Sequence, residues 1–246
     1  MLKHHRILIA ITCFCLAISL SLPFFFQATS SAQNTSTTLP GYPCYRTLET
    51  VLADAEELTT DYPELADWID IGDSWVKQNT SGESGYDLNV LKLTRRSISG
   101  SKPILFLLSA LHARDLAPVE LSLRFAEQLL SDYGTDPEVT WLLDEAEIQI
   151  LLVANPDGRA VVEEQIDQGM AGEGGGDARQ KNLHSGTCAN PDNTGIDLQR
   201  NFPLGWQGSS SGCDNAYSGD EALSEPESQA LRAYLWQIFP DYRAEG

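Results

Sequence analysis

His112 and Asp115 are the side chains of this sequence best suited to chemistry. They stand three positions apart in His112-Ala113-Arg114-Asp115, directly after the apolar run Ile104–Leu108. A strand that ends in a tight turn places its polar side chains at the carboxyl edge of an α/β sheet, where ligands bind. Imidazole and carboxylate groups bind zinc at about 2.0–2.2 Å, and a catalytic zinc usually has three protein ligands and a water. We therefore expect a zinc site here with a third ligand elsewhere; the alternative is that Asp115 pairs with Arg114.

Three further segments carry polar landmarks. They are Asn155-Pro156-Asp157-Gly158 after the apolar run Ile148–Ala154, the segment Gly195–Phe202 (GIDLQRNF), and Ser224-Glu225-Pro226-Glu227. Together with the first turn they match, in order, landmarks of the zinc metallocarboxypeptidases of the carboxypeptidase A type. The chain resembles this family from about Tyr45 to its last residue, and most closely its secreted bacterial, carboxypeptidase T-like members. Four landmarks in order are much harder to match by chance than one short motif.

The resemblance implies a role for each matching residue. His112 and Asp115 match the two zinc ligands of the family's His-x-x-Glu motif, with an aspartate that is one methylene shorter. Asp197 matches the carboxylate that accepts the free ring N–H of the first histidine and fixes its direction. Arg200 matches the residue that binds the terminal carboxylate of the substrate, a task that suits a planar guanidinium. Gln199 stands where the family has an asparagine that shares this task.

Two arginines are further candidates for substrate binding. Arg114 matches a subsite arginine of the family. The family's arginine that stabilises the transition-state oxyanion lies in Trp-Arg-Lys-Asn, and the corresponding segment here is Arg179-Gln180-Lys181-Asn182. Direct alignment puts Gln180 at the arginine position, whereas a slip of one residue beside the Gly-rich stretch 172–176 would let Arg179 serve. Loss of one oxyanion donor typically costs about 100- to 1000-fold in rate.

The sequence stops at Asp241-Tyr242-Arg243-Ala244-Glu245-Gly246. In the family, the third zinc ligand, a substrate-capping tyrosine and the general-base glutamate lie beyond this point, on or after further core strands. We therefore expect a fragment or an interrupted gene product that lacks C-terminal strands and has no general base of its own. His184-Ser185 resembles the missing ligand, but it stands in a polar loop, so we interpret it as a solvated loop histidine.

The N-terminus has the features of a secretory leader. Basic residues at 3 and 6 precede the apolar stretch Ile7–Phe26, and Ser30-Ser31-Ala32 supplies small residues for cleavage. We expect a signal peptide over residues 1–32, an extension over 33–44, and a truncated catalytic domain over 45–246. An uncleaved anchor is the alternative, because about twenty apolar residues can span a bilayer.

Charge and cysteines fit a protein outside the cytoplasm. The chain has 35 acidic and 16 basic residues and a formal net charge of −19, which disfavours nucleic-acid and membrane-surface partners. Beyond the leader stand Cys44, Cys188 and Cys213, and an oxidising compartment favours a disulfide between two of them. The resemblance implies the pair Cys188–Cys213. Cys44 is then left with an intermolecular partner, a free thiol, or a partner outside this sequence.

Strand and helix patterns alternate along the chain. With the resemblance, they predict an α/β fold in which a mixed, twisted sheet has helices on both faces. Residues 169–211 lack periodicity and indicate a long functional loop region. The expected helices are Leu48–Leu58, Pro118–Leu130, Pro137–Asp144 and a last one capped by Ser224, with Glu227 in a capping box; the expected strands are Trp68–Ile71, Leu88–Leu93 and two buried runs, Ile104–Leu108 and Ile148–Val153.

Two hypotheses of function follow. The first is a secreted (extracellular or periplasmic), monomeric, zinc-dependent carboxypeptidase that binds one zinc ion and acts on the C-termini of peptides and proteins. The second is a catalytically inactive secreted relative that binds peptide ends or nothing. Side-chain specificity is not predicted, because the pocket residues that set it lie in the missing part.

Overall fold

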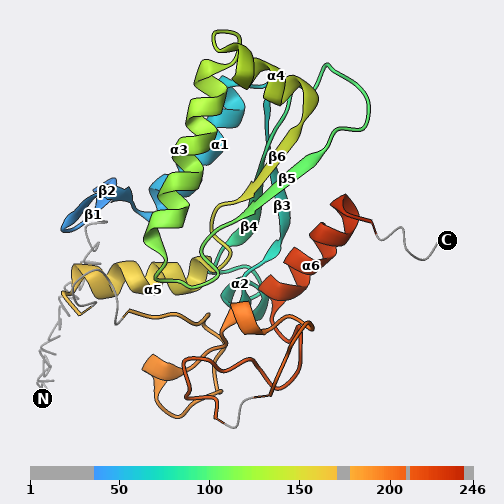
Figure 1. Cartoon of the computed structure of the whole chain (residues 1–246). Helices are drawn as coiled ribbons and strands as arrows, with labels where there is room; N and C mark the ends of the chain where they lie inside the picture. The colour runs from blue at the N-terminus through green and yellow to red at the C-terminus, as the bar shows by residue number, and fades with distance from the viewer. Residues whose placement is uncertain (1–35, 171–177, 209–210, 241–246) are drawn as a thin grey trace, which may run out of the picture. The chain divides into compact units, whose positions relative to one another are not determined.

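The computed structural model describes residues 36–170, 178–208 and 211–240 (Figure 1). The expected signal peptide, the Gly-rich stretch 172–176 and the last six residues lie outside the described residues, so the alternatives for the leader are not tested. Within the described part, no helix has the length and apolar character needed to cross a membrane.

A four-stranded mixed sheet forms the centre of the unit that spans residues 36–246. Its strands lie in the order β3 (Ala66–Asp73), β4 (Asp87–Leu93), β6 (Glu147–Leu151) and β5 (Ile104–Leu108). β3 pairs with β4 and β4 with β6 in antiparallel fashion, whereas β5 and β6 are parallel. A separate two-stranded sheet joins β1 (Thr38–Leu39) and β2 (Tyr42–Arg46). Because β5 and β6 are parallel, the segments that follow them emerge at the same edge of the sheet.

Helices cover both faces of the sheet, as predicted. Figure 1 shows α1 (Leu48–Asp61) and α3 (Leu116–Asp132) side by side on one face and α6 (Pro226–Ile238) on the other, beside β3. The remaining helices are α2 (Trp75–Asn79), α4 (Pro137–Glu145), α5 (Pro156–Asp167) and two short 3-10 turns, η2 (Pro191–Asn193) and η3 (Leu198–Arg200).

The strand alternation divides the core into two layers. Leu91 and Ile150 pack with side chains of α1 and α3, whereas Val90 and Leu151 pack with Leu231 of α6. Successive side chains of a strand point to opposite faces, so β4 and β6 supply apolar groups to both layers. All of these side chains are fully or almost fully buried.

The prediction that Ile104–Leu108 is a buried strand was wrong in its burial. Within the described part of the chain, β5 is the edge of the sheet, and Leu105 and Leu108 are 50% and 39% exposed. A continuous apolar run does not distinguish a central strand from an edge strand whose side chains meet only one neighbour.

Helix starts also differ from the sequence interpretation, and α3 begins at Leu116, two residues before the expected Pro118. The last helix has Glu225, not Ser224, at its N-cap, and Glu227 is buried against α2 instead of closing a capping box. Sequence reasoning missed α5, because Asn155-Pro156-Asp157-Gly158 is typical of a turn. Here Asn155 is the N-cap and accepts from the Gly158 backbone N–H at 3.1 Å, and Pro156 occupies the first helical position.

Candidate functional site

The turn that carries His112 and Asp115 lies between β5 and α3. Its backbone is closed by the Asp115 N–H, which donates to the His112 carbonyl at 3.1 Å. The Ala113 N–H donates to the carbonyl of Gln180 at 3.0 Å, which ties the turn to a segment almost seventy positions away. The turn is thus held in place by a residue that belongs to the same site.

The His112 ring stands between two carboxylates. Its Nδ1 lies 3.4 Å from Asp115 Oδ2, and its Nε2 lies 3.4 Å from Asp197 Oδ1. Two ligand atoms that bind one tetrahedral ion at about 2.1 Å are roughly 3.4 Å apart, so Nδ1 and Asp115 Oδ2 have the spacing of two zinc ligands. Asp197, on the other side of the ring, has the place of a carboxylate that orients a metal-bound histidine.

A third ligand is not found in the described ranges. No group of three His, Cys, Asp or Glu side chains there could hold a metal ion. The described residues therefore fit two ligand positions and the orienting carboxylate of a zinc site, and they do not complete it.

His184 is not the solvated loop histidine that the sequence suggested. Its Nδ1 lies 2.9 Å from Oε1 of the fully buried Glu225, and its ring stacks on Trp75 with centroids 5.2 Å apart. The hydrogen bond to Glu225 raises the pKa of His184. His184 thus belongs to the scaffold between its loop and α6.

Asp197 is the buried hub of the site. Its side chain is 1% exposed. Its Oδ1 accepts from the Gln199 backbone N–H at 3.1 Å, which caps η3. Its Oδ2 accepts from Gln180 Nε2 at 2.9 Å and from Arg200 Nε at 3.1 Å. One carboxylate therefore positions His112, Gln180 and Arg200 together.

Gln180, and not Arg179, faces His112. Its Oε1 accepts from an Arg114 guanidinium nitrogen at 2.8 Å, and its Nε2 lies 3.3 Å from His112 Nε2. Arg114 requires an acceptor and Asp197 requires a donor, so the two neighbours fix the orientation of the amide. The structure therefore corresponds to the direct alignment and not to the slip of one residue.

Arg179 instead organises the backbone of the following loop. Its guanidinium donates to four carbonyls, those of Asn182, Thr194, Pro191 and Asp192, at 2.8–3.2 Å. Burial lowers its pKa. The structure does not bring this substrate-binding candidate to His112.

Gln199 and Arg200 line a pocket of about 470 Å³ next to Asp197. The Arg200 side chain is 60% exposed although its Nε is held by Asp197. An arginine that is fixed at its Nε and exposed at its outer nitrogens can bind an incoming carboxylate with two parallel hydrogen bonds.

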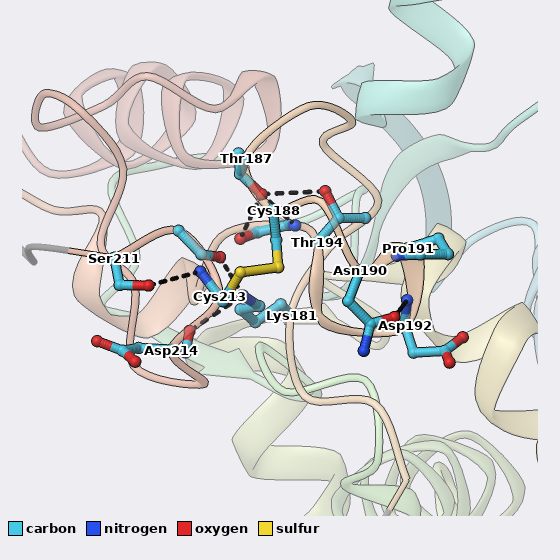
Figure 2. The surroundings of a disulfide bond; sticks show 12 residues. Lys181, Thr187, Cys188, Asn190, Pro191, Asp192, Thr194, Ser211, Cys213 and Asp214 are labelled. Atoms are coloured by element: carbon cyan, nitrogen blue, oxygen red, sulfur yellow. Dashed lines mark hydrogen bonds between the residues drawn. A yellow bond between two sulfur atoms is a disulfide. The ribbon is translucent and has the colours of Figure 1, made fainter.

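A disulfide joins Cys188 to Cys213, the pair that the resemblance implied, across 25 positions that include Asp197 and Arg200 (Figure 2). Cys44 is a free, exposed thiol in the described part of the chain. Figure 2 also shows Lys181 near Cys213, and its Nζ donates to the carbonyls of the two residues on either side of this cysteine, Gly212 and Asp214. The loop that carries η3 is thus closed covalently and by a buried lysine.

Comparison with known proteins assigns the chain to a family. A family model described as zinc carboxypeptidase matches residues 51–242. The chain belongs to the zinc carboxypeptidase family.

Relatives of known sequence and structure agree with this assignment. Rat (Rattus norvegicus) carboxypeptidase A2 is 32% identical over 197 residues, which cover 79% of this chain and 42% of the relative. Bovine (Bos taurus) carboxypeptidase A1 is 29% identical over 210 residues, 84% of this chain and 44% of the relative. The chain thus spans less than half the length of these relatives.

Among solved structures, the carboxypeptidase A from Helicoverpa armigera superposes with a TM-score of 0.64 at 28% identity, covering 79% of this chain and 43% of the other. Thrombin-activatable fibrinolysis inhibitor superposes with a TM-score of 0.65 at 27% identity, covering 78% and 44%. The predicted family and the mixed α/β fold with helices on both faces are confirmed.

Two landmarks of this zinc carboxypeptidase family member serve the scaffold around the site. Asp157 accepts from Ser74 Oγ at 2.9 Å and from the Val76 N–H at 2.8 Å, and Glu227 accepts from the Trp75 N–H at 2.8 Å. Both carboxylates thus bind the first turn of α2. Burial raises the pKa of Asp157, and it raises the pKa of Glu227 to about 8.

Asn182 connects this scaffold to the site, and sequence reasoning did not single it out. Its Nδ2 donates to Glu225 at 2.7 Å, and its Oδ1 accepts from the Ile196 N–H at 2.9 Å. Asn182 therefore joins the segment of Gln180 to that of Asp197. The only sequence signal was its place in the Lys-Asn pair of the family's motif.

Gly158 explains a further part of the second landmark. A Cβ at this position would lie 2.8 Å from both Ala113 Cβ and the Lys181 carbonyl oxygen. Any larger residue would push apart the turn that carries His112 and the segment of Gln180. The glycine is therefore required for close approach of three segments.

Proposed function

We propose that residues 45–246 are part of the catalytic domain of a secreted zinc-dependent metallocarboxypeptidase that removes C-terminal residues from peptides and proteins. The observation that carries the proposal is the His112 ring, with Asp115 at its Nδ1 and Asp197 at its Nε2. A bound zinc ion polarises the scissile carbonyl and lowers the pKa of a water molecule. His112 and Asp115 would hold this ion, with a third ligand and a general base supplied from outside the described residues.

The other side chains bind and orient the substrate. Arg200, held by Asp197 and exposed to the neighbouring pocket, would bind the terminal carboxylate, and Gln199 would assist as a polar neighbour. Arg114 would contact the substrate on the other side of His112. There Gln180 accepts a hydrogen bond from the Arg114 guanidinium. Gln180 has no charge to give to a developing oxyanion, so this step is expected to be slower than with an arginine.

Secretion is supported by the leader pattern and by the disulfide Cys188–Cys213. The expected location is extracellular or periplasmic, and the expected state is a monomer. Peptide and protein C-termini are the expected partners.

The test uses the natural gene product, with whatever sequence follows Gly246. It should release C-terminal residues from a peptide with a free carboxylate and should not act on the same peptide with an amidated end. Arg200→Ala should reduce this discrimination, and a zinc chelator should abolish the release. A gene product that binds zinc fully and still shows no hydrolysis would support the inactive relative instead.

A further inference from the structure

A second cavity, of about 220 Å³, lies next to the site on the side of α5. Among the described residues, three basic side chains line it, Arg114, Arg179 and Lys181, and Asp192 is the one acid. This composition is opposite to that of the chain, which has 35 acidic residues against 16 basic ones. The cavity therefore concentrates positive charge in an acidic protein.

The two inner cations are held by neutral groups. Arg179 donates to four backbone carbonyls and Lys181 Nζ to the carbonyls of Gly212 and Asp214 at 2.9 and 3.0 Å. Within the described ranges, neither side chain forms an ion pair with a carboxylate. Carbonyl dipoles fix the position of a cation without cancelling its charge, so the positive charge remains available to a ligand.

A second basic pocket of the chain shows the contrast. There Lys92 Nζ lies 2.8 Å from Glu147 and Arg96 lies 2.6 Å from Asp67. Those cations have carboxylate partners, whereas Arg179 and Lys181 form no ion pair with any of the residues that the structure describes. The cavity is thus distinguished by cations that are held on backbone carbonyls, and not by the number of basic residues in its lining.

Two further observations favour an anionic ligand in this cavity. Arg179 Nε is buried and has no hydrogen-bond partner among the described residues. Burial, and then the neighbouring charge of Arg179, lowers the pKa of Lys181 to about 8, although the charges of Asp214 and Asp197 act in the opposite direction. Buried donors are nearly always satisfied, and an anion nearby would favour the charged form of Lys181.

We propose that this cavity is an oxyanion-binding site, separate from the zinc and C-terminal carboxylate sites, that takes a carboxylate, phosphate or sulfate group. Guanidinium groups suit such planar or tetrahedral oxygens. Gln180 links the cavity to His112, since it accepts from Arg114 and lies 3.3 Å from the histidine ring. A ligand that engages Arg114 would thus act on the side chain next to His112.

Calorimetry on the full chain at low ionic strength tests the proposal, with inorganic phosphate as one probe and a short glutamate-containing peptide with an amidated C-terminus as the other. Potassium chloride at equal ionic strength is the reference. Saturable 1:1 binding of phosphate alone indicates a free inorganic ion, and binding of the peptide indicates an acidic side chain. Binding of neither above the chloride reference would overturn the proposal.

Asp192→Asn is the decisive variant, because it predicts a gain that misfolding cannot produce. Removal of the single acid in the lining should tighten phosphate or peptide binding by about three- to tenfold. Arg179→Gln should weaken it by at least about tenfold. Arg96→Gln removes the same charge from the pocket in which Arg96 pairs with Asp67, and it should change the affinity by less than about twofold. Equal losses for Arg179→Gln and Arg96→Gln would show that net charge causes the effect and would contradict the site.

Discussion

His112 Nε2 and Asp197 Oδ1 face each other at 3.4 Å, although the two residues are 85 positions apart. The same Asp197 holds Arg200 and Gln180. The direction of the candidate metal ligand and the position of the candidate carboxylate-binding arginine are therefore set by one buried group. Substitution of Asp197 should therefore disturb both the direction of His112 and the position of Arg200.

The first prediction concerns zinc. The chain as given should bind zinc far more weakly than a complete three-ligand site, and His112→Ala should abolish the binding that remains. Asp115→Glu should preserve or tighten it, because the longer side chain has the reach of the family's glutamate. Isothermal titration calorimetry with zinc chloride measures all three.

His184→Gln is the matched control, since His184 is paired with Glu225. It should leave zinc binding unchanged. Tight, stoichiometric zinc on the unaltered chain, or equal binding by His112→Ala, would show that the site is assigned to the wrong residues.

The second prediction concerns the disulfide. Replacement of both Cys188 and Cys213 by serine should lower the free energy of unfolding by about 3.5 kcal/mol, the value expected for closing a loop of 25 residues. Urea denaturation under oxidising conditions measures the change. Cys44→Ser should have little effect because this thiol is exposed and free. If the control lost as much stability as the double variant, the loop closure would not be the cause.

The third prediction concerns Gly158. Gly158→Ala should cost about 1–3 kcal/mol, because the new methyl group would overlap Ala113 and the Lys181 carbonyl. Gly208→Ala, where the added methyl would only reach ordinary contact distance from Trp206 at 3.4 Å, should cost less. Thermal unfolding of the two variants compares them. A fully tolerated Gly158→Ala would mean that the three segments are not as close as described.

The fourth prediction concerns pH. Burial raises the pKa of Glu227 from 4.5 to about 8, so the folded chain binds a proton that the unfolded chain has lost over this range. The contribution of Glu227 to the free energy of unfolding is therefore fully present below pH 4.5 and is lost as the pH rises through about 8. His184, whose pKa is also raised, acts in the same direction.

Glu227→Gln, which mimics the protonated carboxyl, should flatten the pH dependence of the unfolding free energy between about pH 5 and about pH 9. Asp157 and Glu225 belong to the same buried cluster and are left in place. Glu83→Gln, an exposed side chain, is the control. A slope that is the same in both variants would show that Glu227 is not the titrating group.

Much of the fold could be predicted from patterns of known period. The helix Pro137–Glu145 begins at the expected proline behind the cap Asp136, and β5 has the expected bounds. What could not be predicted depends on distant contacts. The edge position of β5 is set by which strands pair, and α5 forms through a start that locally favours a turn. Periodicity contains neither kind of information.

The candidate site residues were predicted from motifs, and residues outside recognisable motifs were not predicted. His112, Asp115 and Asp197 come together as expected, because each stands in a segment with a recognisable pattern. The choice between Arg179 and Gln180 required the backbone, since a slip of one residue reverses which side chain faces inward. Asn182 was overlooked because its four neighbours come from three segments that only the folded chain brings together.

The four carbonyls bound by Arg179 have a consequence for how the loop responds to acidity. A guanidinium keeps its proton throughout the physiological range, so the clamp on residues 182–194 does not weaken where Glu227 and His184 titrate. A lysine at this position would begin to lose its proton, and with it these hydrogen bonds, at alkaline pH. The loop that leads to Asp197 thus keeps these four hydrogen bonds at a pH at which the contributions of Glu227 and His184 to the stability of the fold are lost.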